Sequence, residues 1–132
     1  MIIRDVVLTV NQDTVKLNNK LYCYIEDGAF NLHIKVVNLP FRFDTEKCYV
    51  DAIIKQPNGV DITTVYCTEV EKNVYELPIL KEYLDEIQEL GEHKIQLQFH
   101  SQMLEDGSFT DCASLPLFSM EVKSKLDSKI YI

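Results

Sequence analysis

Apolar and polar residues alternate along most of the chain, and this period-two pattern predicts β-strands. The two clearest alternating segments are 30–36 and 93–99, in which apolar side chains occupy every second position over most of the length. Further strands are expected at 5–10, 15–17, 21–25, 49–55, 62–70, 74–77 and 118–122. Because successive side chains of a strand point to opposite faces, each segment has one face that we expect to be buried.

Turn residues separate these segments. Asn11-Gln12-Asp13 and Glu26-Asp27-Gly28 each end a predicted strand, and Pro57-Asn58-Gly59 supplies the positive φ that a tight hairpin needs. The segment 62–70 has no clear inward face. One alternating set is Thr63, Val65 and Cys67, the other is Ile62, Thr64 and Tyr66, and a β-bulge would explain the mixed pattern.

One segment has a helical period instead. Apolar residues recur at three- and four-residue steps over 79–90, with Pro78 before the segment and Gly91 after it. About eight strands and one short helix predict a mainly β protein, an antiparallel β-sandwich with a helix at about 79–90. We expect one domain over 1–125 and a C-terminal tail over 126–132.

Composition narrows the classes of partner. The chain has 132 residues, 46% of them hydrophobic, and a formal net charge of −8, which argues against binding to nucleic acid. No apolar run approaches the ~20 residues of a membrane span, and the first residues do not form a secretory signal. We therefore expect synthesis in a cytoplasm and no partner that is a membrane.

Four cysteines lie in or near the predicted strands: Cys23, Cys48, Cys67 and Cys112. None forms a closely spaced pair, which disfavours a zinc site. We interpret them as reduced, partly buried thiols. The alternative is one disulfide between sheets, as in immunoglobulin domains, although such domains also place a tryptophan in the core and this chain has none.

A series of motifs in fixed order resembles one protein family. An acidic turn precedes the alternating strand of 27–37, Lys55-Gln56-Pro57-Asn58-Gly59 ends another strand, and Val74-Tyr75-Glu76-Leu77-Pro78 follows. Gly91 then leads the strand that ends at Phe99, and a polar hairpin around Gly107 precedes the strand of 118–122. Over about 15–125 the chain resembles the N-terminal domain of baseplate upper proteins from phages of Gram-positive bacteria.

The resemblance implies an immunoglobulin-like sandwich with a structural role in the tail, which docks on the central baseplate hub and holds host-recognition parts. Other baseplate and tail proteins are then the partners, a homotrimer is a further alternative, and the location is the virion tail after synthesis in a bacterial cytoplasm. A carbohydrate- or surface-binding β-sandwich module is the alternative function, but such modules usually expose tryptophan.

Two groups of residues are candidates for partner binding. Phe41, Arg42 and Phe43 lie on a predicted connection and are residue types that anchor interfaces, although the two phenylalanines could instead cap one end of the sandwich. Tyr22 and Tyr24 share the face opposite Cys23. That face is a contact surface unless the helix or the tail covers it.

Nothing in the sequence predicts catalysis. His33, His93 and His100 are scattered, and we interpret all three as surface or edge histidines. Ser101 adjoins His100, but the chain has no nucleophile elbow of the Gly-x-Ser-x-Gly type. The acidic loop residues lack the alternating ligand series of a calcium loop. We expect no enzymatic activity, no cofactor and no metal.

Overall fold

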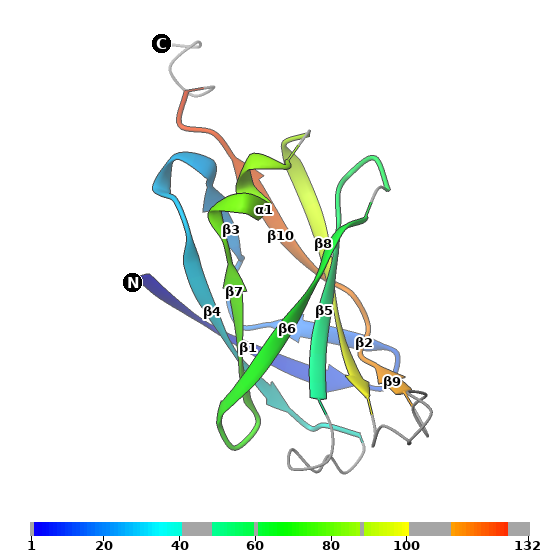
Figure 1. Ribbon diagram of the computed structural model, residues 1–132. Coiled ribbons are helices and arrows are strands. Elements are labelled where there is room, and N and C mark those ends of the chain that lie inside the picture. Colours follow the sequence, from blue (N-terminus) through cyan, green and yellow to red (C-terminus); the bar gives the residue numbers. More distant parts are fainter. Residues whose placement is uncertain (1, 41–48, 60, 88, 101–111, 127–132) are drawn as a thin grey trace, which may run out of the picture.

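The computed structural model is mainly β, and its strands curl into a half-barrel with one short helix at the top (Figure 1). It describes residues 2–40, 49–59, 61–87, 89–100 and 112–126, without the side chains of 61–64 and 112. The strands are β1 (Ile2–Asn11), β2 (Thr14–Leu17), β3 (Tyr22–Tyr24), β4 (Phe30–Val37), β5 (Tyr49–Lys55), β6 (Asp61–Glu71), β7 (Val74–Ile79), β8 (Gly91–His100), β9 (Cys112–Ser114) and β10 (Phe118–Lys123). A 3₁₀-helix η1 spans Ile25–Asp27, and the α-helix α1 spans Lys81–Asp85.

The described strands form one continuous sheet in the order β2-β1-β4-β7-β6-β5-β8-β10-β3, with β9 paired to β8. The pairings of β1 with β4 and of β10 with β3 are parallel, and all the others are antiparallel. The mainly β class with one helix is confirmed, but the sheet is mixed where the sequence predicts an antiparallel sandwich, because alternation predicts which face of a strand is buried and not which strand lies beside it.

The core lies on the inner face of the curled sheet. The inward residues of β1, β4, β5 and β8 are the ones that the alternation predicts, and nearly all are less than 5% exposed. In the middle of the sheet, Ala52 lies opposite Leu97 and Ile54 opposite Ile95, so buried side chains form rows across the strands. Tyr75 of β7 meets Phe99 of β8 edge to face, with ring centroids 5.4 Å apart.

The hairpin between β5 and β6 confirms the predicted turn. Gly59 has φ of +85°, and its N–H donates to the carbonyl oxygen of Gln56 over 2.9 Å. The ambiguity of 62–70 also has a structural basis, since the register shifts between Glu69 and Glu71 where β6 pairs with β7. Val65 and Cys67 are half-buried there, whereas Tyr66 is exposed.

The helix is shorter than the predicted 79–90. Ile79 still belongs to β7, Leu80 is extended, and α1 ends at Asp85. The N–H of Glu86 and that of Ile87 both bond three residues back, to Tyr83 and Leu84, which tightens the last turn. Gly91 already begins β8.

Candidate functional site

The two tyrosines predicted to form a contact surface lie on β3, the last strand of the sheet. Cys23 between them is fully buried and points into the core, so Tyr22 and Tyr24 both face outward. Their rings meet edge to face, with centroids 5.8 Å apart and planes at 79°. Tyr22 is 43% exposed and Tyr24 is half-buried, so this face remains partly open.

Three cations surround these rings. The Nζ atom of Lys123 lies 5.5 Å from the Tyr22 ring centroid, and that of Lys125 lies 5.5 Å from the Tyr24 centroid. The guanidinium carbon of Arg4 lies 5.8 Å from the Tyr22 ring and 4.9 Å from the Phe30 ring. Such cation–π contacts hold aromatic rings in place at a surface. Lys123 and Lys125 thus cover part of this face.

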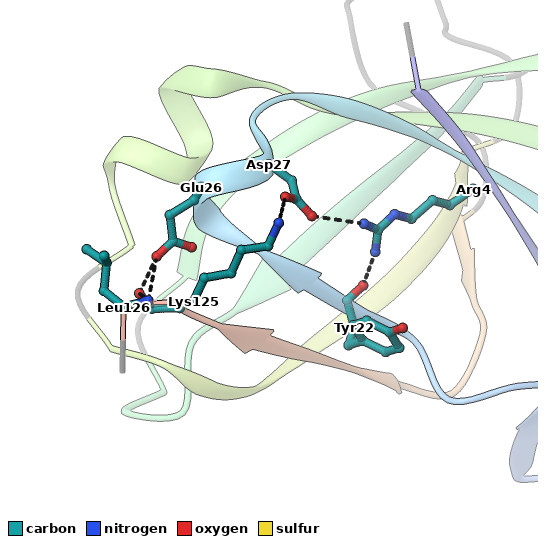
Figure 2. Close-up of polar contacts among 7 residues, drawn as sticks. Arg4, Tyr22, Glu26, Asp27, Lys125 and Leu126 are labelled. Carbon is teal, nitrogen blue, oxygen red and sulfur yellow. Dashed lines mark hydrogen bonds and ion pairs between the residues drawn. The ribbon is translucent and has the colours of Figure 1, made fainter. Parts of the chain in front are cut away.

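Asp27 binds two of these cations, and Glu26 binds the chain after β10 beside them (Figure 2). Lys125 Nζ donates to Asp27 Oδ1 over 2.5 Å, and Arg4 Nη2 lies 3.6 Å from the other carboxylate oxygen. Glu26 accepts hydrogen bonds from the hydroxyl of Ser124 and from the backbone N–H of Leu126. The Ser124 hydroxyl, followed by backbone N–H groups, lowers the pKa of Glu26 to about 2.

Asp27 has the matching effect on its partner, because its hydrogen bond and its charge raise the pKa of Lys125. These contacts attach the residues after β10 to η1, far away in the sequence.

The same cluster spans a gap in the half-barrel, which we call the seam: the space between β3 and residues 2–6 of β1. Arg4 Nη1 donates a hydrogen bond across it to the carbonyl oxygen of Tyr22 (Figure 2). No backbone hydrogen bond joins β1 to β3 in the described part of the chain. Side chains therefore hold these two strands together where a backbone ladder would close a barrel. Arg4 was not identified from the sequence, because a single arginine at the start of an alternating strand carries no local signal.

Phe41, Arg42 and Phe43, the other predicted partner-binding residues, lie outside the described residues. Their part in partner binding stays a prediction.

His93 is not a surface histidine, so this prediction is wrong. It points inward beside Ile95 and is 0% exposed. Its Nδ1 lies 3.2 Å from the carbonyl oxygen of Gly91, which can only accept, so Nδ1 carries the proton. The buried Nε2 has no hydrogen-bond partner among the described residues. Burial lowers the pKa of this imidazole below its ordinary value.

The other two histidines lie on the outer face, and each contacts a carboxylate. His33 Nε2 lies 2.8 Å from Glu76 Oε2, and His100 Nε2 lies 3.1 Å from Asp51 Oδ2. Asp51 is itself buried, at 5% exposure, and the ring of Tyr49 stacks on His100 with centroids 4.5 Å apart. These pairs join neighbouring strands, so they have a structural explanation.

Cys23 and Cys67 are free thiols. Burial raises the pKa of Cys23 to about 11 and that of Cys67 to about 12, which makes both poor nucleophiles at neutral pH. Within the described ranges no group of three or more His, Cys, Asp or Glu side chains could hold a metal ion. None of the helices in those ranges is long and apolar enough to cross a membrane.

A groove of about 320 Å³ lies on the outer face of β1 and β4 and is not lined by Tyr22 or Tyr24. Val7, Val70 and Val74 contribute apolar surface, and charged or titratable side chains such as Asp5 and Lys35 surround it. The groove is shallow and has no concentration of aromatic or cationic groups, so the tyrosine face remains the better candidate site.

Comparison with known proteins gives one informative result. No protein-family model matches this chain, and no curated protein sequence matches it. Among solved structures, its fold is similar to that of the N-terminal domain of phage TP901-1 ORF48. The TM-score is 0.64, the sequence identity is 12%, and the match covers 94% of this chain and 100% of the other. The two domains therefore share a fold over nearly their whole length.

Proposed function

We propose that this chain is a structural component of a phage or prophage tail baseplate, a docking module that attaches host-recognition parts to the central hub. The observation that supports this most is the full-length fold similarity to the N-terminal domain of a phage protein. The ordered sequence motifs that resemble baseplate upper proteins support the same assignment independently of the fold. The immunoglobulin-like class implied by that resemblance belongs to this proposal.

The docking surface in this proposal includes Tyr22 and Tyr24. Tyrosine and arginine are enriched among residues that dominate binding energy, and the cations here pre-position the two rings. Lys123 has no carboxylate partner in the described part of the chain, although the protein carries a net charge of −8. An acidic group on the partner would complement it. We include Phe41, Arg42 and Phe43 in the proposed surface on the basis of the sequence alone.

The proposed role is non-catalytic and requires no cofactor, nucleic acid or membrane. Its partners are other tail proteins, with a homotrimer as one arrangement, and its location is the virion tail. Binding to carbohydrate is the competing function, but no observation in the structure favours it.

Antibody labelling of phage particles, viewed by electron microscopy, tests the proposed function. An antibody raised against this chain should label the tail tip of particles from the source culture. Label that is absent from the tail, although the chain is present in the culture, would contradict the proposal and favour the surface-binding alternative.

The docking surface has its own test. The double variant Phe41→Ala with Tyr24→Ala should remain folded and should assemble into particles less well than the wild type. Unchanged assembly of the folded double variant would remove these residues from the docking surface.

A further inference from the structure

Among the described residues, the edge of β3 that faces away from β10 has no backbone partner. Glu121 N–H donates to the carbonyl oxygen of Leu21 over 2.9 Å, and the parallel register places Glu121 opposite Tyr22. In a parallel ladder this phase directs the N–H and C=O of Cys23 toward β10, and it directs the N–H and C=O of Tyr22 and the N–H of Tyr24 away from β10. The carbonyl of Tyr24 belongs to the first turn of η1. The hydrogen bond from Arg4 to the Tyr22 carbonyl oxygen agrees with this phase.

The facing edge of β1 is open in the same way. Asn18 N–H donates to the carbonyl oxygen of Val7, and Val7 N–H donates to the Asn18 side chain, so the backbone of Val7 points away from β4. Alternation then directs the N–H and C=O of Ile3 and Asp5 away from β4 as well. β2 pairs only with Leu8–Asn11, so it does not cover these groups.

Apolar side chains are exposed beside these open groups. Ile2 and Ile3 are each 52% exposed and Tyr22 is 43% exposed, and Ile3 and Tyr22 both lie on the outer face of the sheet. Open strand edges with exposed apolar residues invite pairing with another chain unless they are protected. Among the described residues, the side chain of Arg4 protects the edge of β3.

We propose that the seam receives an extended segment of a partner tail protein, which adds as a β-strand between β1 and β3. This inference rests on the proposed docking function and specifies how docking occurs. An extended polypeptide is the partner that fits, because it offers N–H and C=O groups at the two-residue spacing found on both edges. The segment would carry an apolar residue near Ile3 and Tyr22 and an acidic residue near Lys123.

In this arrangement Arg4 occupies a hydrogen-bonding position on β3 that the added strand would use. Its hydrogen bond to the Tyr22 carbonyl oxygen must open before a strand can bond there, and Asp27 keeps the guanidinium nearby. The ion pair therefore lets Arg4 leave the edge without becoming an isolated cation.

Proline and alanine variants at the same positions test the proposal, because proline removes the open N–H while alanine keeps it. Tyr22→Pro and Ile3→Pro are compared with Tyr22→Ala and Ile3→Ala, each supplied to phage whose own copy is deleted. Val15→Pro is the matched control, since Val15 sits on β2 with its N–H pointing away from β1. Copies per particle are counted by quantitative mass spectrometry, and circular dichroism verifies folding.

The proposal predicts that both proline variants drop at least about tenfold below their alanine partners, while Val15→Pro stays near the wild type. Equal incorporation of proline and alanine variants, with wild type present in particles, would overturn strand addition and leave the proposed function standing. Wild type that is absent from particles would instead overturn the proposed function, and this inference with it.

Two further measurements keep the test decisive. If a proline variant does not fold, hydrogen exchange of the wild type replaces it: peptides covering 2–6 and 21–25 should exchange more slowly in particles than in the free chain, and equal exchange would contradict the proposal. Sedimentation of the free chain tests the rival occupant. A dimer that Tyr22→Pro abolishes would overturn the partner segment in favour of a second copy.

Discussion

The middle of the sheet and the seam are built in opposite ways. In the middle, β5 lies between β6 and β8, backbone ladders run on both sides, and the inward side chains are buried. At the seam, β1 and β3 face each other through Arg4, Asp27 and Lys125, all of them at least partly exposed. Burial and ladder hydrogen bonds stabilise the first region, whereas exposed ion pairs contribute little to the second.

This difference indicates where the molecule can change without unfolding. Local opening concentrates where buried apolar contacts are few and backbone groups face solvent. The seam has both properties, and the middle of the sheet has neither. A docking site at the seam would therefore leave the fold of the remaining sheet intact.

The largest expected effect comes from breaking the middle of the sheet. Leu97→Ala removes a side chain that is 0% exposed and should lower the free energy of unfolding by about 3 kcal/mol. Urea denaturation followed by circular dichroism measures it. Leu117, which is 41% exposed, is the matched control, and Leu117→Ala should change stability by less than about 0.5 kcal/mol. Equal losses in the two variants would show that the core is not where we place it.

A second prediction concerns the stability of the sheet at acidic pH. His93 is buried without a partner for Nε2 among the described residues, and its pKa in the folded state lies below the ordinary 6.5. Above about pH 6.5 the imidazole is neutral in both states and has no effect. As the pH falls below that value, the unfolded state binds the proton first, so stability decreases until the folded-state pKa is passed.

Stability measured from pH 7 to pH 5 checks this sign. The wild type should lose stability over this range, and His93→Leu should lose much less. Glu26 does not interfere, since its lowered pKa affects stability only as the pH falls below about 4.5 toward 2. A His93→Leu variant with the full slope would contradict the role of His93.

The smallest effect is expected at the seam. Arg4→Met keeps an unbranched apolar side chain but loses the guanidinium, and with it the hydrogen bond to Tyr22, the ion pair with Asp27 and the contact over the Phe30 ring. We expect a loss of about 0.5–1 kcal/mol that shrinks in 1 M salt, because salt screens exposed charges. Lys16→Met on exposed β2 should be neutral. A loss as large as that of Leu97→Ala would mean that the seam is part of the structural core.

The sequence predicted the strands better than it predicted their neighbours. The alternating residues of 30–36 and 93–99 face the core because period-two burial is a local property. The parallel pairing of β1 with β4 joins segments more than twenty residues apart, and no local pattern encodes it. β9 was missed because three residues are too few to show a period.

Two single residues show why the rest could not be predicted. Ile87 keeps the helical spacing but lies beyond α1, because it packs on the core from the connection to β8. His93 is in phase with Ile95, which indicates burial, whereas the polarity of histidine favours the surface. The outward direction of Tyr22 and Tyr24 was predicted from the alternation. The cations around them are Arg4 of β1, Lys123 of β10 and Lys125 after β10, and only the fold brings these three together.

Residue-resolved amide hydrogen exchange on the free chain tests the open seam most directly. The account predicts an alternating pattern: the amides of Arg4, Val6 and Cys23, which face a paired strand, should be protected about 100-fold or more, while those of Ile3, Asp5, Tyr22 and Tyr24 should exchange within about tenfold of the unprotected rate. Uniform protection along 3–6 and 22–24 would contradict it, because it would show that a backbone ladder already closes the seam.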